Sequence, residues 1–450
     1  MSSPRVSPPS RTAGAIDHAA VHALLDERLD WRFKSVPDAL WGLSLTEAAE
    51  RNPRLFESAP GEGDGFVGPF AVLDDDAVEH NLRTLADWCA RHGVVLAPHG
   101  KTTMAPQLFA RQLDHGAWGI TAANTGQLRV YRAFGVSRVV LANQLLDPAG
   151  LRWVAAELDR DAGFDFTCWV DSVRGVELMT EALVAAGARR QVDVLVELGG
   201  AHGRTGARDD EVALAIAEAA RRSPAVRLAG VGGYEGALAH DSSETARSTV
   251  DAYLDRVRAF TIFLARQGFF DGRIMVTAGG SAYFDQVAAG IATGWPDDVE
   301  VLPVLRSGAY VTHDDGFYRG ISPLGGTPRI DDASPLRPAL RVWAQVTSRP
   351  TDELALLTMG KRDASFDEGM PEPQVLRRPG EAPQPLDGHE VTAMNDQHAF
   401  LKLPGSSSVE VGDWVGLGLS HPCTVFDKWA LLPLVAADGE TVTGFVRTYF

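Results

Sequence analysis

The chain has 450 residues and a mass of 48.3 kDa, with 45% hydrophobic and 22% charged residues. This balance is typical of a globular protein and excludes collagen-like, low-complexity and wholly disordered chains. The 42 basic and 59 acidic residues give a formal net charge of −17, which makes nucleic acid and anionic membrane surfaces poor partners.

The first residues are rich in Ser, Pro and Arg, and no apolar run follows them. We therefore expect a disordered tail over residues 1–16, rather than a signal peptide or an anchor. Short helices without a catalytic motif are predicted over residues 17–65. The three cysteines are too few and too scattered for a disulfide framework, and no apolar run reaches the about 18 residues of a spanning helix. These features predict a cytoplasmic protein with free thiols.

Short apolar runs alternate with amphipathic segments from about residue 66, which indicates βα units. After a first run at residues 69–75, eight more follow, at residues 93–98, 118–123, 138–143, 165–171, 192–198, 228–234, 274–279 and 301–307. Helical spacing is clearest over residues 77–93, 210–223 and 244–268. Eight alternations predict a (β/α)8 TIM-type barrel within residues 66–330. A doubly wound open sheet is the competing fold.

The pattern changes near Arg341 to alternating β-type runs without long helices. This change predicts a separate, mainly-β domain over residues 331–450. Residues 361–389 are rich in Pro and polar side chains, so we expect them to form an excursion from this domain rather than one of its core strands.

Lys101 follows the first expected barrel strand, in the segment GVVLAPHGKTTMAP. Active sites of such barrels lie at the carboxyl ends of the strands. Burial there lowers the pKa of an ammonium group and leaves a nucleophilic amine, as a Schiff-base lysine requires. A surface lysine in a turn is the alternative interpretation.

Glycines and hydroxyls follow the seventh and eighth strands, where barrels often bind phosphate. Converging backbone N–H groups and a helix N-terminus can form an anion cradle there. The alternative is a plain turn. The candidate residues are Thr277, Gly279, Gly280 and Ser281 in the first segment and Ser307, Gly308, Ala309 and Tyr310 in the second.

Polar side chains also follow the fifth and sixth strands. Glu197 and Arg204 lie in VELGGAHGRTG, and Tyr234 and His240 lie in GYEGALAH. Arg204 suits a carboxylate or a phenolate oxygen, while Tyr234 suits a ring nitrogen or a stacking contact. The alternatives are an arginine paired with a rim carboxylate and a tyrosine that closes the barrel.

His421 and Cys423 lie two residues apart in SHPCTVFDKW, within the expected β-domain. In an extended segment both side chains project to one side and can bind one Zn²⁺. Two ligands leave positions open for water or substrate, as a catalytic metal requires. A coincidental pair is the alternative.

These motifs, in this order, resemble the fold-type III enzymes that depend on pyridoxal 5′-phosphate (PLP), which share the alanine-racemase-like barrel. More narrowly, the chain resembles the D-threonine aldolase and D-serine dehydratase family, including its bacterial amino acid deaminases. The resemblance covers residues 66–450 and rests on PHGKTTMAP, VELGGAHGRTG, GYEGALAH, TAGGSAYFD, LRSGAYVTHD, GKRDASFDEG and SHPCTVFDKW.

The resemblance implies a role for each candidate. Lys101 would hold PLP, Arg204 would lie beside the cofactor, and Tyr234 would lie near its pyridine nitrogen. The PLP phosphate would be surrounded by Gly279, Gly280, Ser281 and Tyr310, with Thr277 and Gly308 in the same loops. His421 and Cys423 match the family's metal-binding pair, for Zn²⁺ or another divalent metal such as Mn²⁺. A cysteine at the second position is typical of the dehydratases, whereas the aldolases usually carry Asp.

The implied reaction is elimination of water from a D-3-hydroxy amino acid, giving a 2-oxo acid and ammonia. If His240 or another rim histidine acts as base on the substrate hydroxyl, the same site becomes an aldolase that yields glycine and an aldehyde. A racemase and a non-catalytic PLP-binding protein are less favoured, because of the HxC pair and the β-domain respectively. The family also implies a head-to-tail homodimer, with the GKRDASFDEG loop near the partner's site.

Overall fold

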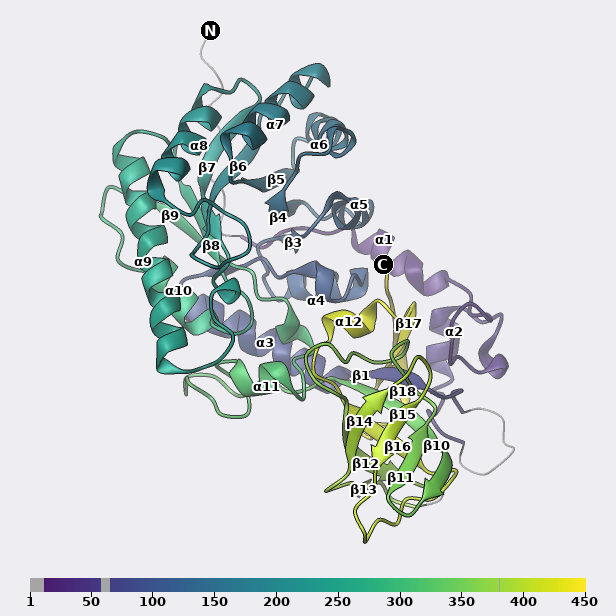
Figure 1. The fold of residues 1–450 in the computed structure, drawn as a ribbon. Helices are drawn as coiled ribbons and strands as arrows, with labels where there is room; N and C mark the ends of the chain where they lie inside the picture. Colours follow the sequence, from purple (N-terminus) through teal and green to yellow (C-terminus); the bar gives the residue numbers. More distant parts are fainter. Residues whose placement is uncertain (1–11, 58–64, 380) are drawn as a thin grey trace.

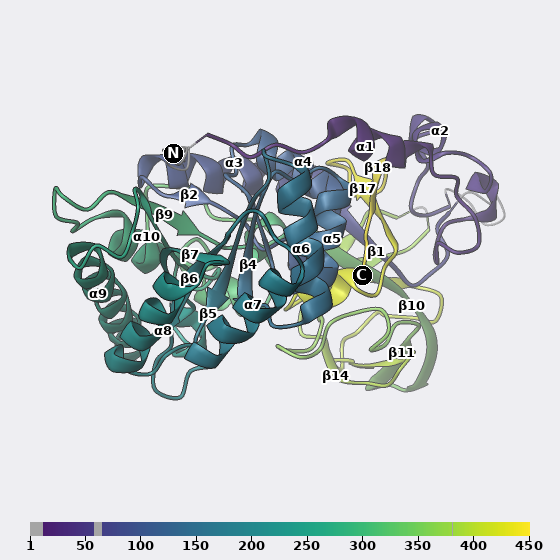
Figure 2. The same cartoon turned by 90° about the horizontal axis from the view of Figure 1, so that it is seen from above.

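The computed structural model describes residues 12–57, 65–379 and 381–450. A barrel and a mainly antiparallel β-domain lie side by side in two views (Figures 1 and 2). Eight parallel strands form the barrel sheet, in the order β2-β9-β8-β7-β6-β5-β4-β3. They are β2 (Val95–Leu96), β3 (Ile120–Ala122), β4 (Arg138–Gln144), β5 (Asp165–Val170), β6 (Val192–Leu198), β7 (Val226–Gly233), β8 (Ile274–Ala278) and β9 (Val301–Leu305).

The sheet closes into a barrel because the segments of β2 and β3, the two strands at the ends of this order, are hydrogen-bonded to each other. Strand β2 pairs in parallel with β9, the last strand of the barrel. Between β2 and β3, the Trp118 N–H donates to the Leu96 carbonyl over 2.7 Å, and the Thr121 N–H donates to the Pro98 carbonyl over 2.8 Å. An open, doubly wound sheet would leave two free edges. The predicted (β/α)8 barrel is therefore confirmed, and each of its eight strands falls on an expected apolar run.

Helices cover the outside of the barrel, and the three that were predicted most clearly are present. Asp, Asn or Ser side chains cap most of these helices by accepting a bond from the first turn. The helices are α3 (Asp75–Arg91), α4 (Pro106–Asp114), α5 (Thr125–Ala133), α6 (Pro148–Arg160), α7 (Val173–Ala185), α8 (Asp210–Arg222), α9 (Glu244–Arg266), α10 (Phe284–Ala292) and α11 (Phe317–Ile321).

The barrel interior is filled by side chains rather than hollow. A compact cluster contains Trp118, Val140, Trp169, Leu195, Met275 and Leu302. Because these residues come from alternate positions of different strands, their packing closes the interior below the mouth. The candidate site therefore lies above this cluster, at the carboxyl ends of the strands and on the short helices that follow them.

The β-domain contains a strand from the other half of the chain. Strand β1 (Phe70–Asp74) pairs with β10 (Leu340–Thr351) on one side and with β17 (Leu431–Val435) on the other. The run at residues 69–75, which falls within the predicted bounds 66–330 of the barrel domain, therefore belongs to the β-domain sheet instead. The remaining strands are β11 (Leu354–Leu357), β12 (Glu372–Arg377), β13 (Gln384–Pro385), β14 (Glu390–Met394), β15 (Ala399–Lys402), β16 (Trp414–Gly418) and β18 (Val442–Arg447).

The expectation that residues 361–389 form only an excursion is wrong. Strand β12 pairs with β16 over five positions and lies inside the ten-stranded sheet. Its Pro373 is buried and pairs with Leu417. The register shifts between Pro373 and Val375, and this irregularity accommodates a residue that has no N–H to donate. The remainder of this segment, from Lys361 to Met370, is irregular and leads towards the barrel mouth.

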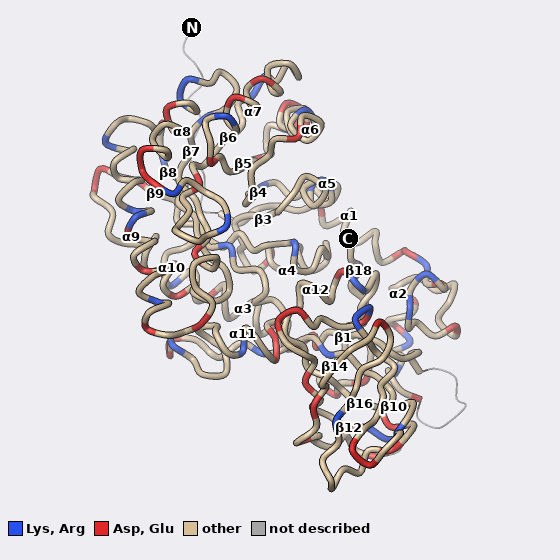
Figure 3. Tube along the Cα trace, in the orientation of Figure 1, with Lys and Arg blue, Asp and Glu red and all other residues tan. Residues whose placement is uncertain are grey.

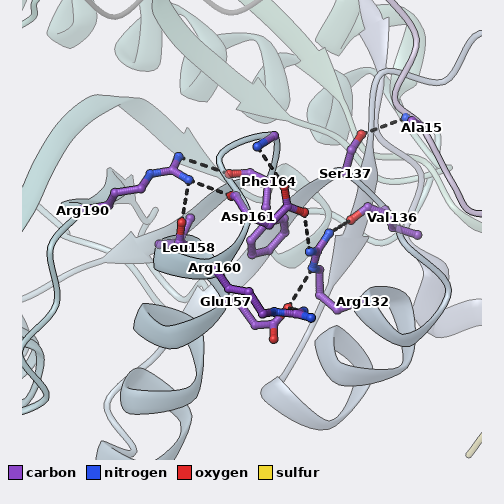
Figure 4. Close-up of polar contacts among 11 residues, drawn as sticks. Ala15, Arg132, Val136, Ser137, Glu157, Leu158, Arg160, Asp161, Phe164 and Arg190 are labelled. Atoms are coloured by element: carbon purple, nitrogen blue, oxygen red, sulfur yellow. Dashed lines mark hydrogen bonds and ion pairs between the residues drawn. The ribbon is translucent and has the colours of Figure 1, made fainter. Parts of the chain in front are cut away.

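The N-terminal segment forms short helices, as predicted, and packs against both domains. Helices α1 (His18–Ala23) and α2 (Leu45–Glu50) frame 3-10 turns. Residues 1–11 of the expected tail lie outside the described residues. Residues 12–16 lie along the barrel. The Ala15 N–H donates to Ser137 Oγ over 2.8 Å (Figure 4). The Gly14 N–H donates to the Ala117 carbonyl over 2.9 Å.

A polar network ties this side of the barrel together (Figure 4). Arg132 donates to Glu157 and Asp161 and lies over the ring of Phe164. Arg190 donates to three carbonyls at the end of α6, those of Leu158, Asp161 and Phe164. The positions of acidic and basic residues are interspersed along the helices of the barrel (Figure 3).

Two further sequence expectations can be compared with the structure. Within the described residues, no helix is long and apolar enough to cross a membrane. Cys89 and Cys168 are buried, Cys423 is half-buried, and all three are free thiols, as expected.

Candidate active site

Lys101 lies on the 3-10 turn η3 (Gly100–Thr102), directly after β2 and at the mouth of the barrel. Its side chain is exposed at the opening, yet the surrounding protein lowers its pKa. Loss of hydration where the protein packs around the amine is the main cause, and the positive charges of Arg204 and Arg306 add to it, while Cys423 acts in the opposite direction. The amine therefore loses its proton more readily than a surface lysine does.

His99 precedes Lys101 and was not singled out from the sequence. Burial, and then the charges of Lys101, Arg306 and Arg204, lower its pKa well below the usual value. Its buried Nδ1 has no hydrogen-bond partner within the described part of the chain. A neutral imidazole with an unused ring nitrogen therefore lies beside the lysine.

The β-domain brings the HxC pair to the same place. Cys423 begins the short helix α12 (Cys423–Phe426), and its thiol contacts Thr102 Oγ1, on the turn of Lys101, at 3.3 Å. His421 Nδ1 lies 2.6 Å from Asp367 Oδ2. Burial alone would lower the pKa of His421, but hydrogen bonds to Cys423 and Asp367 outweigh it and raise the pKa to about 9. Among the described residues, no group of three or more His, Cys, Asp or Glu side chains forms a metal site.

Arg204 and Tyr234 lie together on the far side of the mouth. The Arg204 guanidinium carbon is 5.1 Å from the centre of the Tyr234 ring. Burial and the neighbouring Glu235 raise the pKa of Tyr234 to about 12, so its phenol stays neutral. Glu197 lies below them, buried on β6, where it accepts bonds from Thr205 at 2.7 Å and Gln144 at 2.5 Å.

The glycine turn after β8 is engaged in a way that the sequence did not predict. Glu235, fully buried, accepts the Gly279 N–H over 2.8 Å and the Gly280 N–H over 3.0 Å. Gly279 has a φ of +112°, a conformation that favours glycine. These two amides therefore hold a carboxylate of the protein itself, and the predicted anion cradle is reduced to the hydroxyls and amides next to it.

The hydroxyl of Thr277 is also bound by other groups of the protein. Its hydroxyl donates to the Val304 carbonyl over 2.8 Å and accepts from Arg306 over 2.5 Å. Arg306 itself is 2% exposed, stacks over Trp169 and donates to the Gly233 carbonyl. Burial lowers its pKa to about 10, against the opposing effect of Glu235 and other acidic neighbours. The hydroxyl of Thr277 thus helps to hold the buried Arg306 guanidinium in place.

The remaining candidates divide into two groups. Ser281 is buried beside the glycine turn, and a Cβ at Gly308 would lie 2.7 Å from that of His99, so both border the mouth. Tyr310 does not: its hydroxyl bonds to Gln112 at 3.3 Å, and it lines a cavity of about 270 Å³ between α3 and α4 together with Cys89. His240 is exposed beyond the 3-10 turn that follows β7.

Four residues of this region were missed, and one of them had a sequence signal of its own. Arg306 lies near the end of the apolar run VLPVLRS, where a charged side chain is unusual in a buried strand. His99, Glu235 and Asp367 lie in the quoted motifs, but nothing in the sequence distinguishes them there, because their contacts depend on how distant segments meet.

Known proteins support this architecture. The "Alanine racemase, N-terminal domain" family model matches residues 73–292, and the "Putative serine dehydratase domain" model matches residues 339–435. A D-threonine aldolase from Arthrobacter sp. is 30% identical over 361 residues, which cover 80% of this chain and 86% of the relative. The chain therefore belongs to the D-threonine aldolase and D-serine dehydratase family.

Two more relatives are informative. D-threo-3-hydroxyaspartate dehydratase from Delftia sp. (strain HT23) is 25% identical over 393 residues, covering 83% of this chain and 96% of the relative. The crystal structure of D-threonine aldolase from Filomicrobium marinum superposes with a TM-score of 0.72 at 25% identity, covering 85% of this chain and 95% of the other. The alanine-racemase-like barrel followed by a β-domain is thus a shared architecture.

Proposed function

We propose that the protein is a PLP- and divalent-metal-dependent lyase that eliminates water from D-3-hydroxy amino acids, giving a 2-oxo acid and ammonia. The observation that carries the proposal is the meeting of Lys101 with the His421–Cys423 pair at the barrel mouth, through the 3.3 Å contact of Cys423 with Thr102. Similarity to a D-threonine aldolase and a hydroxyaspartate dehydratase supports a lyase that acts on β-hydroxylated D-amino acids.

The residues at the mouth fit PLP. Lys101 offers an amine with a lowered pKa, Tyr234 a neutral phenol, and His99 a buried ring nitrogen that lacks a partner. Ser281 and the loop of Gly308 would hold the phosphate, since Glu235 occupies the amides of Gly279 and Gly280. When bound, PLP acidifies the substrate Cα–H by delocalising the negative charge that develops there.

The chain's own groups would then move and position protons. Lys101 Nζ, with its lowered pKa, is suited to accept a proton and to return it. Arg204 lies over the face of Tyr234 and fixes the orientation of the phenol. Buried Arg306 donates to Thr277 and the Gly233 carbonyl, and buried Glu235 accepts two glycine amides, so both groups are held beneath the site and need no rearrangement during the reaction.

The donor set of the HxC pair fits a borderline-soft divalent metal such as Zn²⁺, because a thiolate and an imidazole are its preferred ligands. When bound, such a metal polarises the substrate hydroxyl as a Lewis acid. A hydroxyaspartate dehydratase has been solved with a cysteine replaced by alanine, in a metal-free form, and with a histidine replaced two positions earlier. That spacing equals the spacing of His421 and Cys423 and supports the proposal.

Product analysis tests the proposal. Purified protein loaded with PLP and Zn²⁺ should convert D-serine or D-threonine into a 2-oxo acid with equimolar ammonia. Chelation of the metal, or substitution of Lys101→Ala, should abolish turnover. Absence of both products, with exchange of the α-proton alone, would contradict a lyase and point to a racemase.

Retro-aldol cleavage is the second candidate, favoured by the 30% identity to a D-threonine aldolase. It requires a base for the substrate hydroxyl, and the exposed His240 is the candidate from the rim. Glycine plus an aldehyde in the same assay, lost in His240→Gln, would assign this reaction instead.

A further inference from the structure

A carboxylate from a distant segment holds the imidazole of His421. Asp367 Oδ2 lies 2.6 Å from His421 Nδ1, and Asp367 Oδ1 accepts a bond from Thr424 Oγ1 over 2.8 Å. Both oxygens of this side chain are therefore directed at the turn that carries the HxC pair. The two residues are 54 positions apart in the chain, so the contact is made by the fold and not by local geometry.

The chemistry of this contact assigns the two ring nitrogens different tasks. A carboxylate accepts hydrogen bonds and cannot donate, so Nδ1 must carry the proton that lies between them. Nε2 is then the ring atom that a metal can bind, in exchange for the proton that this nitrogen carries in the imidazolium form. Histidines that bind metals almost always make such a bond through their other nitrogen, which fixes the ring and increases its basicity.

The segment that carries Asp367 is anchored on both sides of it. Asp363, which is 3% exposed, accepts the Gly360 N–H over 3.0 Å, and its carbonyl accepts a bond from Trp429 Nε1 over 2.8 Å. On the other side, Ser420 Oγ donates to the Glu368 carbonyl and accepts the Phe317 N–H, which links β-domain and barrel. The loop that carries Asp367 is thus fixed by hydrogen bonds on both sides of this residue.

We propose that Asp367 is a positioning residue that orients His421 for a divalent metal, with Zn²⁺ as the expected ion. Its carboxylate sets which ring nitrogen faces the metal and limits rotation of the imidazole before the metal arrives. The inference rests on the metal pair of the proposed function, and it assigns a role to a residue outside that pair.

Metal affinity tests the inference without any assay of the reaction. Zn²⁺ would be titrated into the metal-free, PLP-loaded full chain in competition with a chromophoric chelator. Asp367→Asn should weaken Zn²⁺ binding by about 10- to 100-fold, the usual cost of losing such a partner. Asp367→Glu, which keeps the carboxylate, should recover part of the loss.

Glu368→Gln is the matched control, because it removes the same charge from the next, exposed residue. Its affinity should stay within about threefold of the wild type if position matters rather than net charge. The thermal midpoint and the PLP absorbance of each variant report whether the fold is kept. Equal losses in Asp367→Asn and Glu368→Gln, or no loss in Asp367→Asn, would overturn the positioning role.

The result also separates this inference from the function beneath it. A wild-type chain that binds no Zn²⁺ would refute the metal in the proposed function. A wild-type chain that binds Zn²⁺ tightly, together with an unaffected Asp367→Asn variant, would refute only the role of Asp367.

Discussion

Asp314 is buried between the 3-10 turn η5 (Ala309–Val311) and helix α11, with 4% of its surface exposed. Its Oδ1 accepts the N–H groups of Gly316, Tyr318 and Arg319, while Oδ2 has no partner among the described residues. Burial raises the pKa of this carboxyl to about 7, despite the opposing effect of these bonds. Asp314 thus binds the N–H groups at the start of helix α11, and the free-energy cost of its buried negative charge depends on pH.

The sign of that dependence gives a prediction. A folded-state pKa above the unfolded value stabilises the fold fully below about pH 4, and the stabilisation is lost as the pH rises through 7. Asp314→Asn keeps the Oδ1 acceptor and cannot ionise. Its thermal midpoint should therefore rise relative to that of the wild type between pH 5 and pH 8, which corresponds to a gain of up to about 3 kcal/mol in unfolding free energy. The same midpoint difference at both pH values would contradict this.

At the residue scale, sequence patterns identified the candidate site residues better than the residues that contact them. Lys101, Arg204, Tyr234, His421 and Cys423 come together as a group at the mouth. The glycine turn, by contrast, depends on Glu235, and neither its burial nor its aim towards two amides can be inferred from one sequence. Such pairings arise from the spatial order of β7 and β8, which local spacing does not specify.

At the element scale, helices α9 and α10 pack closely where a glycine faces a leucine. A Cβ at Gly290 would lie 2.8 Å from the Leu254 Cβ, too near for real carbon atoms. Gly290→Ala should force the helices apart and lower the unfolding free energy by about 1–3 kcal/mol. Chemical denaturation followed by circular dichroism would measure the loss.

The matched variant is Gly320→Ala, in helix α11, where nothing lies within 4 Å of the added methyl group. It should be neutral or stabilising by about 0.5–1 kcal/mol, since alanine loses less conformational freedom in a helix. Equal effects of the two substitutions would refute the packing argument.

The elements themselves were largely predictable, because strand runs and helical periodicity are local signals. All eight barrel strands fall on expected runs. Strand β12 was missed because its proline and polar residues do not give a strand pattern, and the strand is stabilised by long-range pairing with β16. The place of β1 was missed for a related reason: an apolar run does not indicate which sheet it joins.

At the scale of the whole molecule, β1 couples the two domains. Leu73 is fully buried and faces Leu340 on one side and Leu434 on the other. Leu73→Ala should cost about 2–5 kcal/mol through the cavity that it leaves. Because helix α3 follows β1 directly, we expect the loss to reach both domains. Hydrogen exchange followed by mass spectrometry should show faster exchange in peptides of both β6 and β16; protection lost in the β-domain alone would refute the coupling.

The same strand constrains how the protein is made. Phe70 pairs with Trp343, so about 270 residues must leave the ribosome before β1 meets its first partner. At typical synthesis rates this takes on the order of 15–50 s, during which a four-residue apolar run has no sheet to join. The barrel can begin to form in this interval, whereas the β-domain cannot be completed until β17 and its partner β18 have emerged. The newly made chain thus carries an unpaired, aggregation-prone strand for most of its synthesis, and its yield should depend on chaperones that shield such strands.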